Sequence, residues 1–549
     1  MLYTLLMLIL LLPTLAGLGA IFKNIFRSFP RGIALQIIAG IFFTTITWTI
    51  LAFFIPLNIY VEIGTLIIGI TAFFYFKVYL QFWNFISKNS LLFLSISLLI
   101  IFFGSYYPFI LDHFGYYVPT VKWLSEVGLV QGISNLDLLL GQNSFWHIFQ
   151  AGFSNLSDPF LRINVLMLII YLIYVLEKKS WIHLVLFPLL FLFLQSPSTD
   201  LPAIVFSLII LNEVFLENKN SEFLFALSVF VFAIKPTMIW LPIFIFFYSF
   251  LILKSNYKVL FVGTAVLLLF IFKNIWTFGF PIFPVQFVDL GLSWKPNAEL
   301  LQNSSEMAMM KTFDMQYSFE EIQQFSKFDY IKNWLFINGI KSVIHLLFVL
   351  SLIVFLVFAF IKKSKLIWIL FISILIKSIV VLLFSAQYRF FFDVFFVVFF
   401  VLFYQILSKK LALLIFSLSS IFIGAFLSFP NLVTTYLPSF KLGNFMTGFT
   451  KTQFVKPAAF ALNKYNTHQI GNLKFNVVDG YIFSFDTTLP AISPQFIQED
   501  LDAGIFPQLK GETLKDGFIW RKITEEEKIK IEVILEQYSK TIPAINDSK

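Results

Sequence analysis

The chain has 549 residues, of which 58% are apolar, 19% aromatic and only 13% charged. Soluble globular proteins usually carry about 25% charged residues, so a water-soluble body of this size is excluded for lack of polar surface. The net charge of +8 does not indicate nucleic-acid binding, because the basic residues stand in short clusters between apolar runs, and the absence of cysteine excludes disulfide scaffolds and thiolate zinc sites.

Apolar runs recur along most of the chain. A spanning helix needs roughly 20 mostly apolar residues, and this criterion predicts an all-α polytopic membrane protein with about 14 transmembrane helices. The last two residues before the run 237–253 are Lys235-Pro236, so this run and the one before it can instead form one broken or re-entrant element. The predicted spans are 1–22, 32–55, 57–77, 91–111, 161–177, 181–195, 201–216, 223–234, 237–253, 259–277, 342–361, 366–385, 390–407 and 411–429.

Clusters of Lys and Arg occur in every second short loop between these runs, and loops of this kind usually face the cytoplasm. We therefore predict that 1–429 is a transmembrane domain whose loops 112–160 and 276–341 lie outside the cytoplasm, as does the tail 430–549. The clusters are Lys23, Arg27 and Arg31; Lys88; Lys178 and Lys179; Lys219; Lys254 and Lys258; Lys362, Lys363 and Lys365; and Lys409 and Lys410.

The tail 430–549 is richer in polar residues than the rest of the chain. Residues 473–478 alternate like a strand, and 524–541 begin at Thr524 and continue as a capped amphipathic helix. We predict a small extracytoplasmic α/β domain.

The first large loop begins with Asp112, directly after the run 91–111. A partly desolvated carboxylate at a helix mouth suits a general base or a metal ligand; the alternative is an interfacial cap within a belt of tyrosines. The rest of the loop is predicted to form amphipathic helices lying on the membrane.

Other charged residues are expected at the same side of the membrane. Asp200 is a second candidate catalytic carboxylate, although alone it also fits an ordinary helix cap. Cations at this boundary suit a lipid-linked phosphate, and snorkelling towards headgroups is the alternative. Lys377 lies in the middle of an apolar run, where a charge is a functional candidate. The candidate substrate-binding residues are His113, Tyr116, Lys122, Lys235, Lys273, Lys377 and Arg389.

Common catalytic motifs are absent from the sequence. It contains no Walker A pattern, no dinucleotide glycine fingerprint and no HExxH, and its five histidines are scattered. A histidine metal site and ATP-driven transport therefore have no support.

The order of the polar motifs resembles the GT-C superfamily of membrane glycosyltransferases. The resemblance covers roughly residues 90–520 and is closer still to an uncharacterised bacterial family of GT-C-like membrane proteins, through Lys122-Trp123, Trp146 and Lys273-Asn274 among other pieces. The motifs are an outer-loop Asp112, then Asp200-Leu201-Pro202, Lys235-Pro236-Thr237 and Gln387-Tyr388-Arg389-Phe390-Phe391.

The resemblance implies a sugar donor carried on polyprenyl phosphate and used at the extracytoplasmic side of the bacterial inner membrane. It implies that Asp112 activates the acceptor or helps to hold a divalent metal (Mg or Mn), that Asp200 is the second acidic position, and that Arg389 binds donor phosphate. The sequence departs from the superfamily in having His113 where a second adjacent acid is common, and in having more than the usual single helix before the key loop. The acceptor that the resemblance implies is a glycan, lipid or protein.

Three other function classes stay open from the residues alone. A flippase or transporter of lipid-linked sugars would place paired charges in broken helices at mid-membrane, and only Lys377 is clearly deep. A polysaccharide polymerase or ligase would rely on outer Arg and His rather than on paired aspartates. A non-catalytic assembly subunit is the fourth reading.

Overall fold

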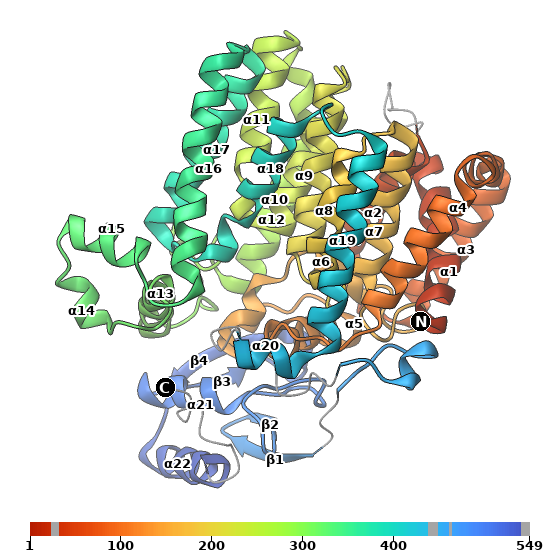
Figure 1. Ribbon diagram of the computed structural model, residues 1–549. Coiled ribbons are helices and arrows are strands. Elements are labelled where there is room, and N and C mark those ends of the chain that lie inside the picture. The colour runs from red at the N-terminus through yellow and green to blue at the C-terminus, as the bar shows by residue number, and fades with distance from the viewer. Residues whose placement is uncertain (23–31, 437–447, 461–463, 540–549) are drawn as a thin grey trace.

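A computed structural model describes residues 1–22, 32–436, 448–460 and 464–539. Long helices stand side by side in a bundle, and a smaller C-terminal segment lies against one end of that bundle (Figure 1). The basic cluster Lys23, Arg27 and Arg31, used above for orientation, lies outside the described residues.

The bundle helices follow the apolar runs of the sequence closely. Each predicted run contains one main helix. The helix ends lie within six residues of the predicted bounds except in α4, which begins 13 residues before its predicted start and ends seven residues before its predicted end. The helices are α1 (Leu2–Phe22), α2 (Ile33–Ala52), α3 (Ile59–Tyr75), α4 (Val78–Gly104), α7 (Ile163–Lys178), α8 (Ile182–Leu190), α9 (Asp200–Phe215), α10 (Ser221–Ile234), α11 (Trp240–Phe247), α12 (Phe261–Phe278), α16 (Ile340–Lys362), α17 (Lys365–Phe384), α18 (Phe392–Phe403) and α19 (Lys409–Ser428).

Seven helical segments within the described residues are long and apolar enough to cross a membrane. They are α1, α2, α4, α16, α17, α19 and the segment Tyr257–Phe278 that contains α12. The remaining bundle helices are shorter, and α7, α9 and α10 are almost completely buried between the others. By contrast, α16 exposes a row of large apolar side chains, including Val343, Leu347 and Leu350. A helix that is apolar all round is either buried in protein or faces lipid, and the bundle contains both kinds.

The segment 112–160 does not form the surface helices that we predicted. It contains the π-helical turn η1 (His113–Tyr117), α5 (Val118–Glu126), the short turns η2 (Ile133–Asn135) and η3 (Leu138–Gln142), and α6 (Phe145–Ala151). All seven residues of α6 are buried. The prediction failed because the apolar side chains of this segment pack between the bundle and the C-terminal segment, and periodicity alone does not tell a lipid partner from a protein partner.

The second large loop, 276–341, forms an arm of three helices beside α16 (Figure 1). These are α13 (Ala298–Thr312), α14 (Phe319–Gln323) and α15 (Lys327–Leu335). Asn297, Ser318 and Ser326 each accept a hydrogen bond from a backbone N–H in the first turn of the helix that follows, which explains where the helices begin.

The C-terminal segment is a small α/β unit. Strand β1 (Tyr465–Ile470) pairs antiparallel with β2 (Leu473–Val478), and β3 (Ile505–Leu509) pairs antiparallel with β4 (Phe518–Lys522). The helices are α20 (Pro430–Tyr436), α21 (Pro494–Asp502) and α22 (Glu525–Ser539). Strand 473–478 is confirmed with its predicted bounds, and α22 confirms the helix predicted from Thr524.

The core of this unit is shared with the loop that follows α4. Trp123, Ile133 and Leu136 of that loop are buried in one cluster with Phe475 and Phe518 of the C-terminal segment. Hydrogen bonds also link the C-terminal segment to the rest of the chain, because the Lys515 ammonium donates to the carbonyls of Ala52 and Leu129. Residues on the two sides of the predicted domain boundary at 430 therefore pack in one core.

Burial raises the pKa of Asp137, in the same interface, from 3.8 to about 8, with Glu499 adding to the rise and a hydrogen bond from the Leu139 N–H opposing it. Between about pH 4 and pH 8 the folded chain keeps this proton and the unfolded chain does not, so Asp137 makes stability fall as pH rises. The slope contributed is at most about 1.4 kcal/mol per pH unit. Asp137→Asn keeps the acceptor for Leu139 and is expected to flatten the dependence of the thermal unfolding midpoint on pH; a variant with the wild-type slope would contradict this assignment.

Candidate functional site

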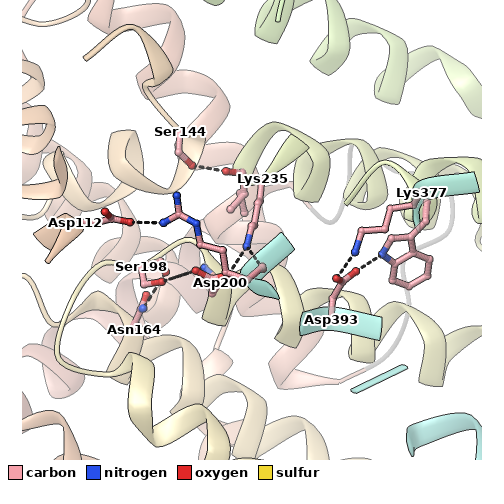
Figure 2. Close-up of polar contacts among 11 residues, drawn as sticks. Asp112, Ser144, Asn164, Ser198, Asp200, Lys235, Lys377 and Asp393 are labelled. Carbon is pink, nitrogen blue, oxygen red and sulfur yellow. Dashed lines mark hydrogen bonds and ion pairs between the residues drawn. The ribbon is translucent and has the colours of Figure 1, made fainter. Parts of the chain in front are cut away.

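Four charged side chains from separate parts of the chain meet at the end of the bundle that faces the C-terminal segment. Asp112 Oδ2 lies 3.0 Å from Arg389 Nη1, and the Lys235 ammonium pairs with Asp200. Lys235 Nζ also lies 3.4 Å from the main-chain oxygen of Arg389, which joins the two ion pairs into one cluster. Figure 2 shows Asp200 between Lys235 and Ser198, with Asp112 on the neighbouring segment. We call Asp112, Asp200, Lys235 and Arg389 the charge cluster.

Asp112 stands directly before the π-helical turn η1. Such turns are rare and occur frequently at functional sites. Its side chain is 45% exposed, as is that of Arg389, so both are reachable by a ligand. Asp112 is thus the accessible carboxylate of the cluster.

Asp200 begins α9, where a negative charge interacts favourably with the helix dipole. Ser198 holds its orientation, because the Ser198 hydroxyl lies 3.1 Å from Asp200 Oδ2 and 3.2 Å from the Asp200 nitrogen. Asn164 of α7 in turn donates to the Ser198 carbonyl at 3.0 Å. Asp200 is therefore fixed by its own loop and by a buried helix, and its side chain is only 21% exposed.

Lys235 ends α10 in an extended conformation, with φ −146° and ψ 105°. Pro236 explains this geometry, since a residue before proline avoids the helical region. The preceding residue, Ile234, accepts a hydrogen bond of 2.7 Å from the Ser144 hydroxyl, which ties the end of α10 to the start of α6. The Lys-Pro pair thus turns the ammonium towards Asp200.

Arg389 lies in the short turn η8 (Tyr388–Phe390) between α17 and α18. Its guanidinium contacts Asp112, and its backbone oxygen contacts Lys235. Two acids and two bases give the charge cluster no net charge at neutral pH.

Tyr117, the last residue of η1, faces the same cluster. Burial raises its pKa well above 10, Asp112 and Asp200 raise it further, and Arg389 and Ser198 lower it. The phenol therefore stays protonated and can act as a hydrogen-bond donor. The sequence analysis did not select Tyr117 from the tyrosines around it, and its place at the end of a π-helical turn is visible only in the structure.

Several candidate substrate-binding residues have partners elsewhere. The Lys122 ammonium contacts the Asp486 carbonyl and the Glu126 carboxylate, so it belongs to the contact with the C-terminal segment. Lys273 is fully buried and donates to the carbonyls of Gln142 and Asn143 at 3.2 and 2.5 Å. These two lysines hold loops in place rather than joining the charge cluster.

His113 and Tyr116 lie in η1 beside the cluster but are buried. Burial lowers the pKa of His113 well below 6.5, so the ring is neutral. The Tyr116 ring packs on His147, with centroids 5.1 Å apart. Both side chains shape the wall behind Asp112.

Lys377 forms an ion pair that the sequence analysis missed. Its ammonium lies 2.5 Å from Asp393 Oδ1, and Asp393 Oδ2 accepts a hydrogen bond of 2.8 Å from the Trp240 indole (Figure 2). The pair joins α17, α18 and α11, and the two side chains are 0% and 6% exposed. Asp393 could have been found by the argument used for Lys377, because it is an isolated acid in the predicted span 390–407.

The residues around Asp112 do not make a protein-ligated metal site. In the parts of the chain that the structure describes, no three His, Asp or Glu side chains group closely enough to hold a metal ion. Asp112 and Asp200 each face a cation. A cation is thus the nearest charged partner of each carboxylate, and the divalent metal that the resemblance implied at Asp112 stays a prediction.

The apolar helices and the polar cluster at one end of the bundle define a mainly helical, membrane-embedded protein. Comparison with known families then shows that the chain belongs to a family described as a domain of unknown function (DUF8201), whose model matches residues 1–396. The match includes all four residues of the charge cluster and ends before α19 and the C-terminal segment. No curated protein and no solved structure matches the chain.

Proposed function

We propose that this protein is a membrane glycosyltransferase of GT-C type, with about 14 transmembrane segments in a bacterial inner membrane. It moves a sugar from a polyprenyl-phosphate donor to an acceptor at the extracytoplasmic side. The observation that carries the proposal is the meeting of Asp112, Asp200, Lys235 and Arg389 at one end of the bundle, although they are far apart in sequence. Residues that only cap helices or snorkel towards headgroups are not expected to contact one another.

The cluster has the groups that this reaction needs. Asp112 takes the proton of the acceptor hydroxyl while the acceptor oxygen bonds to the anomeric carbon of the sugar. The bond from that carbon to the phosphate oxygen breaks, and polyprenyl phosphate leaves with the bonding electrons. Arg389 and Lys235 stabilise the charge on the departing phosphate. Backside attack of this kind inverts the anomeric centre.

The observed ion pairs indicate how substrate is admitted. Arg389 pairs with Asp112, and a donor phosphate competes for the same guanidinium, for which it is a bidentate partner. Binding of the phosphate frees Asp112 to act as a base. Asp200 keeps Lys235 in place, which makes it a positioning residue. No step of this mechanism uses a metal ion.

The test uses the full chain in lipid nanodiscs with a panel of radiolabelled polyprenyl-phosphate pentoses and hexoses and a membrane extract as acceptor source. Transfer with release of polyprenyl phosphate is expected for one donor class. Arg389→Gln is expected to lower kcat/KM for that donor about 100-fold, the scale of losing one charge-stabilising donor. Arg521→Gln, which removes a partly exposed arginine paired with Glu527 in the C-terminal segment, is the matched control and should retain activity.

A transporter of lipid-linked sugars is the second candidate. The buried Lys377–Asp393 pair favours it, since ionisable groups within membranes often mark transport pathways. The two functions separate in sealed proteoliposomes. Movement of intact donor across the bilayer without sugar transfer would replace the glycosyltransferase proposal with the transporter.

A further inference from the structure

A polar cavity lies beside η8. It has a volume of about 100 Å³ and is lined by Lys311 and Asp314 at the end of α13, by Lys341 at the start of α16, and by Gln387 and Tyr388 before α18. This volume is ample for water or for a small polar group.

The cavity holds a surplus of positive charge. Lys341 pairs with Asp314 and lies 5.5 Å from the centre of the Tyr388 ring. Lys311 has no ion-pair partner within contact distance among the described residues, although it acts electrostatically on Glu499 of α21. Two lysines against one lining aspartate leave the cavity cationic, whereas the charge cluster is neutral. An anion is therefore favoured in the cavity, with the Tyr388 hydroxyl and the Gln387 amide as further donors.

The backbone beside the cavity adopts an unusual conformation. Asp314 and Met315 have φ values of +55° and +60°, which non-glycine residues seldom adopt, and two in succession are costly. The turn brings the Asp314 carboxylate against Lys341. The strain is offset by contacts that keep this side of the cavity in shape.

The cavity borders the lipid-facing surface of the bundle. Met315, which lines it, is 51% exposed, and Ile340, immediately before Lys341, is 40% exposed. Leu383 and Phe384, at the end of α17 and a few residues before Gln387, are 79% and 64% exposed. A ligand with a charged head in the cavity could rest an apolar tail on these side chains.

We infer that this cavity binds a phosphate group, either the headgroup of an anionic lipid or free inorganic phosphate, through Lys311, Lys341 and Tyr388. The site does not depend on glycosyl transfer, because it rests on its own lysines and its place beside the lipid-facing surface. Tyr388 and Arg389 are consecutive in η8, so the phosphate site adjoins the charge cluster without sharing its cations.

The experiment is a titration of the purified full chain in a neutral detergent with three probes: dihexanoyl phosphatidic acid, dihexanoyl phosphatidylcholine and inorganic phosphate. Saturable binding of the phosphatidic acid is expected, and Lys311→Gln with Lys341→Gln is expected to weaken it at least about tenfold, a modest share of two charge-assisted bonds. Lys327→Gln, at an exposed lysine of α15 on the same arm, is the matched control. Lys311→Gln alone breaks no contact ion pair and should weaken binding in a chain that is otherwise intact.

The probes distinguish the two sources of phosphate. Binding of phosphatidic acid much more tightly than of inorganic phosphate identifies a lipid headgroup, and similar binding of both identifies the free ion; either outcome supports the site if the lysine variants weaken it. Equal binding by wild type and the double variant overturns it. Failure of wild type to bind either phosphatidic acid or inorganic phosphate also overturns it, and neither failure bears on glycosyl transfer by the charge cluster.

Discussion

Asp112→Asn is expected to reduce the turnover of the lipid-linked donor by about 10²- to 10⁴-fold, the range that general-base catalysis contributes. The reason is that an amide cannot take the proton of the acceptor hydroxyl. It can still accept a hydrogen bond from Arg389, which donates to Asp112 in the structure, so the geometry of η8 should survive. The substitution therefore removes chemistry while keeping most of the contacts.

The measurement is kcat at saturating donor for wild type and variant in nanodiscs. Asp289→Asn is the matched control, since Asp289 is an exposed aspartate that also pairs with a lysine, Lys295, but lies away from the cluster. Near-normal donor KM with a reduced kcat is the expected pattern. A variant that keeps wild-type kcat would remove Asp112 from the role of base, and loss of activity in Asp289→Asn would show that the assay reports folding.

Lys377→Met is expected to destabilise the protein by about 3–5 kcal/mol, because it leaves the Asp393 carboxylate buried without a counter-charge. Both side chains are almost fully buried, so water cannot replace the lost ammonium. The double variant Lys377→Met with Asp393→Asn should be more stable than Lys377→Met alone. Asparagine removes the charge and still offers an oxygen to the Trp240 indole, which donates to Asp393 in the native chain.

Thermal unfolding of the three proteins in one detergent provides the test. The midpoint is expected to be highest for wild type, lower for the double variant and lowest for Lys377→Met. If the double variant is no more stable than Lys377→Met alone, the pair does not act as a unit. If the double variant regains stability and also keeps activity, the pair serves only structure, because the protein then does not need these charges for transport.

The bundle was predictable because each of its helices is encoded by a local run of apolar residues. Uninterrupted apolar runs can satisfy backbone polar groups in lipid only by forming helices, and each run does contain one. The predicted strand 473–478 and the helix after Thr524 were equally local, since alternation and capping are properties of a few adjacent residues. Length was less informative, because buried helices such as α9 and α10 are apolar without being long.

The sequence by itself determined that Asp112, Asp200, Lys235 and Arg389 are charged residues at the ends of apolar runs, and this made them candidates for a functional site. Only the tertiary structure decided that these four meet, that Lys122 and Lys273 instead hold loops, and that Asp393 neutralises Lys377. It also decided that the loop after α4 packs against the C-terminal segment rather than on lipid. The physical reason is that periodicity records which side of an element is apolar, whereas the partner of a charge or of an apolar face depends on segments hundreds of residues away.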